Sequence, residues 1–400
     1  MSRDKAILLF GLVTYGMGQS LLYVIFGPLA RDLGLAEWQF GVLISASNVA
    51  IVLFSPMWGR ASQTRGRKTI FIVGLIGYAV GYAALAFGIQ IGMWAIITAT
   101  PLFFALLAAR LVYGVMASAI SPAATAYIAD TTDEANRAAG MALVAASGGI
   151  GTILGPVLGG VLALIGPVVP MYTAAGLAIV AAILSGAKLT EPARHADLDT
   201  SANVSVFDAR IFPYLFGWFI IFMVFTGIQT IAAFYIEDRL GFEDSSDVTA
   251  VTSIALFCMA IVTLVVQIVV MQVWKLSPKF LLRASFLLFG AVLTVFALSD
   301  GLLMFYLSFA GMGLSFAMAA PGLNTAASLA VEPREQGAVA GWLSSAPAFG
   351  MIFGPALGGI LFKYSAAIPI LSGAVLSVLM GIAFFFINIP EPAEAATADG

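Results

Sequence analysis

Arg110 is the one charged side chain that the sequence places well inside a long apolar run. If that run crosses a membrane, a charge at this depth costs at least about 2.5 to 3.5 kcal/mol unless it faces protein or water. The guanidinium could receive an anionic group of a substrate, or it could hydrogen-bond to helix ends as a structural brace. We expect a functional role, because charges inside membrane spans usually mark functional sites.

The acidic residues avoid the middle of the apolar runs. None of the 21 Asp and Glu lies there, although a membrane carboxylate is the usual proton carrier because burial raises its pKa toward the working range. Asp130, at the end of one run, is the best remaining candidate, with Arg67 and Arg110 as electrostatic neighbours. The acids closest to the runs all stand at their ends: Asp32, Asp130, Glu237, Asp238, Asp247 and Asp300.

Several kinds of chemistry are excluded or disfavoured. Cysteine and histidine occur once each, as Cys258 and His195, so no disulfide can form within the chain and no metal site is expected. No phosphate-cradling GxxxxGKS/T sequence is present, so we expect no nucleotide cofactor and no ATP-driven activity. Without a nucleophile–base pair or paired acids in the apolar runs, an enzyme is not expected. A receptor would need a soluble module, and no polar segment is long enough for one.

The composition predicts a membrane protein made of helices. Hydrophobic residues make up 61% of the 400 residues, charged residues only 10%, and the mean hydropathy is +1.01. Soluble domains are about a quarter charged, and a helix needs about 20 apolar residues to cross a bilayer. Twelve predicted spans cover approximately residues 6–30, 39–58, 69–89, 100–129, 137–163, 168–187, 211–236, 247–273, 279–299, 301–330, 337–362 and 366–389.

The two halves of the chain repeat each other. The segment Gly151–Gly160, with its Gly-Pro pair, returns 199 positions later as Gly350–Gly359, and Pro122 returns as Pro321 with the same spacing. Such repeats are typical of transporters built from two related halves. We therefore predict an N-terminal bundle of six helices (1–187), a cytoplasmic linker (188–210), a C-terminal bundle of six helices (211–390) and a tail (391–400).

The basic residues predict the orientation in the membrane. If the N-terminus is inside, fourteen of the eighteen Lys and Arg fall on cytoplasmic segments, three fall outside and Arg110 lies within a span. This bias follows the positive-inside rule, so both termini are expected in the cytoplasm.

Three motifs make the whole chain resemble the major facilitator superfamily, specifically its twelve-span drug and metabolite exporters of the tetracycline-efflux type. The loop after span two reads Gly59-Arg-Ala-Ser-Gln63-Thr-Arg-Gly-Arg67-Lys, span four contains Arg110-Leu-Val-Tyr113-Gly, and span five contains Gly155-Pro156. The resemblance implies two bundles of six helices related by a pseudo-twofold axis, which expose a central cavity alternately to each side. It also links the position of Arg110 to proton transfer.

The resemblance assigns conformational roles to the motif residues. The family has an Asp where this chain has Gln63, and that Asp interacts with the positive end of span eleven to help lock the outward-open state. Gln63 lacks the charge, so we expect the lock to be weaker or rebuilt. The family also pairs the arginine of this motif with an acid at the end of span four, and these positions match Arg67 and Asp130 here. The predicted switch residues are Gly59, Gln63, Arg67, Arg110, Asp130, Gly155, Pro156, Gly354 and Pro355.

Spans one, four, seven and ten line the cavity in this architecture, so polar and aromatic residues on them are candidates for substrate binding. Trp342 in span eleven could add a stacking face. The predicted substrate residues are Gln19, Tyr23, Arg110, Tyr113, Gln229, Asn324 and Trp342.

The outer ends of spans one and seven carry charges in reversed order. Arg31 could therefore meet Asp238, and Asp32 could meet Arg239, to close the outer mouth, although exposed pairs are usually worth only about 0 to 1 kcal/mol.

The sequence thus predicts an exporter of small amphipathic compounds in the inner (plasma) membrane, exchanging its cargo for protons. The alternatives are facilitated diffusion without coupling and an importer or uniporter of an organic anion that uses Arg110 as its anion contact. The expected partners are a small-molecule substrate, protons and the lipid bilayer. No nucleic acid is expected, and the chain is expected to act as a monomer.

Overall fold

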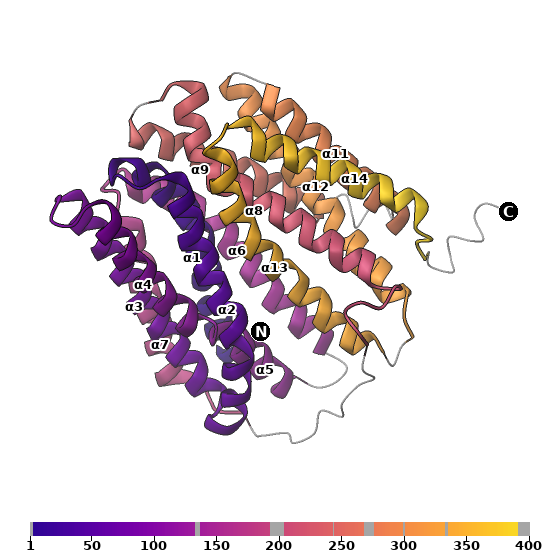
Figure 1. Ribbon diagram of the computed structural model, residues 1–400. Coiled ribbons are helices and arrows are strands. Elements are labelled where there is room, and N and C mark those ends of the chain that lie inside the picture. Colours follow the sequence, from indigo (N-terminus) through magenta and orange to yellow (C-terminus); the bar gives the residue numbers. More distant parts are fainter. Residues whose placement is uncertain are drawn as a thin grey trace. The chain divides into compact units, whose positions relative to one another are not determined.

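A computed structural model describes residues 3–132, 137–192, 204–242, 244–267, 276–298, 301–332 and 335–390, and every regular element among them is helical (Figure 1). Helices suit a lipid environment because each satisfies its backbone hydrogen bonds internally. The helices are α1 (Arg3–Asp32), α2 (Glu37–Arg65), α3 (Arg67–Met93), α4 (Ala99–Ala117), α5 (Ile120–Asp130), α6 (Arg137–Ala163), α7 (Val169–Lys188), α8 (Phe212–Leu240), α9 (Ser245–Val265), α11 (Pro278–Leu298), α12 (Leu302–Leu329), α13 (Gln336–Phe362) and α14 (Ala367–Phe386).

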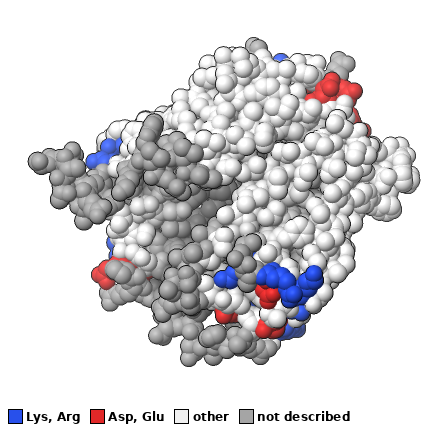
Figure 2. Space-filling model, turned by 180° about the vertical axis from the view of Figure 1, so that it is seen from behind, with Lys and Arg blue, Asp and Glu red and all other residues white. Residues whose placement is uncertain are grey.

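Within the described residues, twelve helical stretches are long and apolar enough to cross a membrane, with α4 and α5 counted as one stretch. The predicted class, an all-α membrane protein with twelve spans, is confirmed. The surface agrees with it: Figure 2 shows broad areas without a charged side chain and confines Lys, Arg, Asp and Glu to small groups.

The chain divides into two compact units. One contains residues 1–197 and 242–253, and the other contains residues 198–241 and 254–400. The main division falls inside the predicted linker, 188–210. The segment 242–253, which includes the start of α9, groups with the first unit although the sequence analysis placed it in the second bundle.

In each unit a helix with a Gly-Pro pair packs backbone to backbone against the first helix of that unit. A Cβ atom added to Gly155 on α6 would lie 2.5 Å from the carbonyl oxygen of Met17 on α1. A Cβ added to Gly354 on α13 would lie 2.3 Å from the carbonyl oxygen of Met223 on α8. Only glycine permits so close an approach, so the repeated motif builds the same helix contact twice.

Span four is broken, whereas its counterpart α12 is continuous. α4 ends at Ala117 and α5 begins at Ile120, two residues before Pro122, while Pro321 lies inside α12. Proline supplies no N–H, so the break leaves the helix ladder one hydrogen bond short. The indole Nε1–H of Trp58 on α2 donates to the carbonyl oxygen of Val115 at 2.7 Å and helps to satisfy the end of α4.

Candidate functional site

Arg110 lies on α4 inside the first unit, and its side chain is 3% exposed. Its Nη2 donates a hydrogen bond to the hydroxyl of Ser47 on α2. The guanidinium carbon lies 4.5 Å from the centre of the Tyr113 ring, in a cation–π contact. Two helices therefore hold the buried charge in place.

Four tyrosine rings form a cluster beside this arginine. The rings of Tyr78 and Tyr82 on α3 are stacked with their centres 4.8 Å apart, and Tyr82 lies 5.3 Å from Tyr113. Tyr15 on α1 lies 6.2 Å from Tyr78. The hydroxyl of Tyr82 donates to the carbonyl oxygen of Gly18, so the cluster joins α1, α3 and α4.

Some buried polar atoms of this cluster have no hydrogen-bond partner among the residues that the structure describes. Within the described residues, the Nε of Arg110 and the hydroxyl of Tyr113 are buried without a hydrogen-bond partner, and no carboxylate forms an ion pair with Arg110. A fixed positive charge with open donor capacity can hold an anionic group or polarise a neighbouring hydroxyl. The buried side chains described here offer no carboxylate that could exchange a proton with it.

The structure brings together three of the predicted substrate residues. Arg110 and Tyr113 touch, and the amide of Gln19 donates to the Tyr15 hydroxyl at 3.0 Å. Tyr23 is buried on α1. Sequence reasoning missed four members of this site. A signal existed for two of them, since tyrosines four residues apart share one helix face. The missed residues are Tyr15, Ser47, Tyr78 and Tyr82.

The other three predicted substrate residues lie in the second unit. Gln229 is buried on α8. The side-chain oxygen of Asn324 on α12 accepts a hydrogen bond from the indole of Trp218 at 3.1 Å, and Trp218 was not predicted. Trp342 lies on α13 and donates to the carbonyl oxygen of Val204 at 2.8 Å.

Trp342 also forms part of an apolar pocket of about 330 Å³. Its walls come from α8, α13 and the chain just before α8, and most of them are aromatic. Because the Trp342 N–H is already satisfied by Val204, the indole presents only its ring to the pocket. The lining residues are Val206, Phe212, Leu215, Phe216, Phe219, Trp342, Ser345, Ala346, Phe349 and Phe353.

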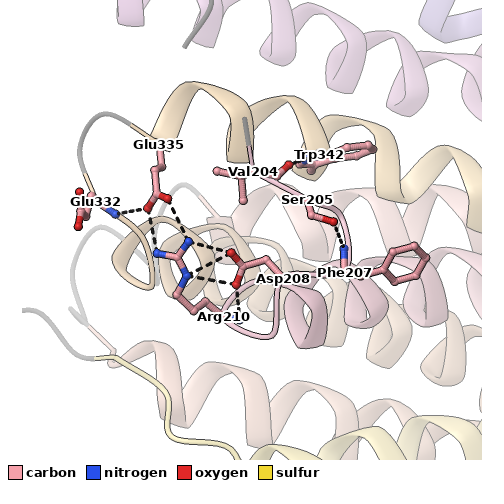
Figure 3. A network of polar contacts seen from close by, with 8 residues as sticks. All are labelled: Val204, Ser205, Phe207, Asp208, Arg210, Glu332, Glu335 and Trp342. Atoms are coloured by element: carbon pink, nitrogen blue, oxygen red, sulfur yellow. Dashed lines mark hydrogen bonds and ion pairs between the residues drawn. The ribbon is translucent and has the colours of Figure 1, made fainter. Parts of the chain in front are cut away.

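A charged network fastens the chain before α8 to the start of α13 (Figure 3). Arg210 lies between two carboxylates, with Nη2 2.8 Å from Asp208 and Nη1 2.9 Å from Glu335. Hydrogen bonds from Arg210 lower the pKa of the Asp208 carboxyl below its usual range. Glu335 also accepts the backbone N–H of Glu332 at 3.0 Å. This network and the Trp342–Val204 bond fix one wall of the pocket.

Three of the predicted switch residues, Gln63, Arg67 and Asp130, lie at helix ends in the first unit. Arg67 Nε lies 2.9 Å from Asp130 Oδ2, so the pair that the family resemblance implies is present. Gln63 is exposed on the last turn of α2. A Cβ added to Gly59 would lie 3.9 Å from Pro122, an ordinary contact that does not require glycine. Pro156 and Pro355 lie inside α6 and α13.

The residues of the predicted outer gate are divided between the two units, and each pair is described within its own unit. Arg31 binds Glu37 at 2.7 Å within the first unit, a contact that the sequence analysis did not foresee. Asp32 is the last residue of α1, and Asp238 and Arg239 stand in the last turn of α8. The cross-unit pairs stay a prediction.

Comparison with known proteins adds the family. A model of the Major Facilitator Superfamily matches residues 8–274 and 249–400. Multidrug resistance protein 2 of Bacillus subtilis (strain 168) is 30% identical over 392 residues, which cover 94% of this chain and 93% of that protein. Tetracycline resistance protein, class B, of Escherichia coli is 27% identical over 392 residues, with 93% and 91% covered.

Among solved structures, a bacterial homolog of the human lysosomal transporter Spinster, in an inward-facing and occupied conformation, has the same fold. The TM-score is 0.72 at 15% identity, and the match covers 96% of this chain and 95% of that one.

Proposed function

Because the chain belongs to the Major Facilitator Superfamily, we propose that it exports small amphipathic organic compounds by alternating access, in exchange for protons. The names of its relatives, which include multidrug and tetracycline resistance proteins, support export of drug-like molecules. The single observation that carries the proposal is the buried Arg110–tyrosine cluster, which gives an otherwise apolar bundle one concentrated polar site. Few polar groups in an apolar wall suit an amphipathic ligand.

The cargo has two kinds of contact available. Within the first unit, Arg110, Gln19 and the tyrosine hydroxyls can bind polar groups of a cargo. Within the second unit, Gln229 and Asn324 are polar candidates, and the apolar pocket beside Trp342 can stack an aromatic group. Hydrogen-bonding groups would set orientation and apolar surface would supply most of the affinity.

Proton coupling requires a group that can take up and release a proton during the cycle. In the described helices the carboxylates stand in the first or last turns, and Asp130 is held by Arg67. We propose Asp130 as the proton carrier, with Arg67 as the charge that it releases when it is protonated. The chain would act as a monomer in the plasma membrane, with both termini in the cytoplasm and without nucleic acid.

The proposal predicts gradient-dependent flux in proteoliposomes. With purified protein in vesicles of defined lipid, an imposed pH gradient should drive lipophilic drugs against their own concentration gradient, and collapsing the gradient with a protonophore should stop accumulation. Protein-free vesicles with the same gradient are the control, because weak bases also follow pH by themselves. Cargo movement that is indifferent to the gradient would refute antiport and favour facilitated diffusion.

A second candidate function rests on the absence of an ion pair at Arg110 in the described residues. An unneutralised guanidinium would attract a carboxylate, so the chain could instead import an organic anion or let it diffuse passively. The same vesicles separate the two functions. Uptake of organic acids, without uptake of lipophilic amines and without a pH effect, would support the second.

The aromatic pocket predicts a selective change in affinity. Replacing Trp342 with alanine should raise KM for aromatic cargo by about twofold to tenfold, since an aromatic contact contributes about 0.5 to 1.5 kcal/mol beyond area burial. W342F keeps a ring but loses the hydrogen bond to Val204, so its KM should fall between those of the wild type and W342A. W94A, at an exposed indole beyond α3, is the matched control. An unchanged KM in W342A would remove the pocket from the cargo path.

A further inference from the structure

We propose that Glu191, the first acidic residue after α7, is a positioning residue for transport. Its carboxylate caps the start of α3 and thereby holds Arg67 in register with Asp130. The inference rests on the transport function proposed above, and it concerns a residue that neither the motifs nor the family resemblance singled out.

The carboxylate of Glu191 sits directly on the N-terminus of α3. Its Oε1 accepts the backbone N–H of Arg67, the first residue of that helix. The first N–H groups of a helix have no partner inside the helix and carry partial positive charge, so a carboxylate is well suited to this place. The residue at the N-cap position, Gly66, offers no side chain of its own for this purpose.

Gly66 is shaped for this contact. Its φ of 101° is a conformation that L side chains rarely adopt, and a Cβ built there would lie 2.7 Å from Glu191 Oε2. The backbone turn therefore requires glycine, and the Glu191 carboxylate occupies the space beside it.

The residue capped by Glu191 is also the residue that reaches Asp130. Arg67 Nε lies 2.9 Å from Asp130 Oδ2 on α5, and its Nη1 donates to the Ser62 hydroxyl on α2 at 2.7 Å. Its side chain is 17% exposed and that of Asp130 is 15% exposed. Because Glu191 fixes the backbone and Asp130 fixes the side chain, the position of the guanidinium depends on both acids.

The segment around Glu191 is itself well anchored. The hydroxyl of Thr190 donates to Asp4 on α1 at 2.6 Å, and the carbonyl oxygen of Thr190 accepts the Tyr127 hydroxyl at 2.8 Å. Lys68 Nζ donates to the carbonyl oxygen of Gly186 on α7 at 2.8 Å. The two-residue segment Thr190–Glu191 thus contacts α1 and α5 through Thr190 and the start of α3 through Glu191.

The α2–α3 turn has a carboxylate contact although Gln63 carries no charge, and the partner of this carboxylate is the start of α3. Gln63 is exposed and uncharged, whereas Glu191 brings a carboxylate to the same turn from 124 residues away. The charge of Glu191 would hold the shape of the α2–α3 turn while the bundle changes orientation. Loss of that charge should slow the conformational cycle and leave cargo binding intact.

The test is a set of flux measurements on full-length protein in proteoliposomes. E191Q keeps the size of the side chain and removes its charge, and we expect its maximal rate to fall about fivefold to twentyfold, within the range of typical coupling between sites, with KM unchanged. D244N removes an exposed acid whose contact is with the nearby Ser246, and it should transport like the wild type. E191D keeps the charge on a shorter side chain. If the charge matters, its maximal rate should lie between those of E191Q and the wild type.

A double-mutant cycle separates positioning from general stability. If Glu191 acts through Arg67, adding E191Q to R67A should cost less than about twofold more, because residues in one network are not additive. Independent, multiplying losses would overturn the proposal, as would a wild-type rate in E191Q or a rate loss matched by an equal loss of folded protein on heating. If the wild-type protein itself moves no cargo, the proposed function fails instead.

Discussion

Replacing Arg110 with glutamine should lower the transport rate by about 10-fold to 150-fold, because hydrogen bonds to a charged group contribute about 1.5 to 3 kcal/mol each. The folded state should not be weakened to match. Within the described residues the guanidinium has no carboxylate partner, so its removal leaves no charge stranded, and Ser47 keeps its bond to the carbonyl oxygen of Ile44 at 2.7 Å. Burying an unpaired charge costs free energy, so its removal relieves that cost.

Arg283 offers a matched control for this experiment. It lies on α11, its guanidinium carbon is 4.4 Å from the Phe385 ring centre, and its Nε donates to the carbonyl oxygen of Phe384 at 3.1 Å. R283Q therefore breaks the same two kinds of contact at a site with no proposed role. Flux and thermal unfolding of both variants should be measured side by side. If R110Q loses stability and keeps its rate per folded molecule, Arg110 is a brace and the substrate hypothesis is wrong.

Gly354→Ala should destabilise the second unit by about 1 to 3 kcal/mol or more, the usual cost of overpacking a filled core. The added methyl would lie 2.2 Å from the hydroxyl of Thr226 and 2.3 Å from the carbonyl oxygen of Met223. The hydroxyl can rotate away, but the carbonyl belongs to the backbone of α8, so α8 and α13 must separate. Thermal unfolding in detergent and the yield of monodisperse protein would measure the effect.

The control for this substitution lies on the same helix. A Cβ built on Gly341 of α13 meets no atom within 4 Å, so G341A should fold as well as the wild type or slightly better, since alanine favours helix more than glycine does. Adding T226A to G354A should not restore stability, because the clash with Met223 remains. Equal melting temperatures for G354A and G341A would show that the two helices do not need their close approach.

The helices were predictable because apolar length is a strong signal, but their ends were not. The predicted span 39–58 became α2, Glu37–Arg65, and the predicted span 211–236 became α8, Phe212–Leu240. Hydropathy reports where the bilayer ends, whereas helix hydrogen bonding continues into polar sequence until a residue such as Gly66 or Gly241 stops it. The break in span four was not predicted, because a proline alone does not decide whether a helix is interrupted. Span four breaks just before Pro122, whereas α12 continues through the counterpart Pro321.

Some residues of the candidate site were likewise predictable from the sequence, and others were not. Arg110 stands out from sequence because a charge among apolar residues is conspicuous, and the Arg67–Asp130 pair follows from the family resemblance. Glu191 carries no such mark, since a Glu-Pro pair at the start of a polar stretch is ordinary. Its role becomes visible only in the fold, which brings it across 124 residues to Arg67. The Arg31–Glu37 pair joins the end of α1 to the start of α2, whereas the charge pattern between the halves predicted pairs with Asp238 and Arg239 on α8.

The broken span four makes the two units differ in stiffness. A continuous helix such as α12 transmits a push at one end to the other as a rod does. A span interrupted between Ala117 and Ile120 can instead bend at the break, because the run of helical hydrogen bonds is interrupted there. A movement of α5 near Asp130 would therefore bend the span at this break and would displace Arg110 on α4 less. The first unit therefore contains a span that can bend between α4 and α5, and the second unit contains the stiffer, continuous helix α12.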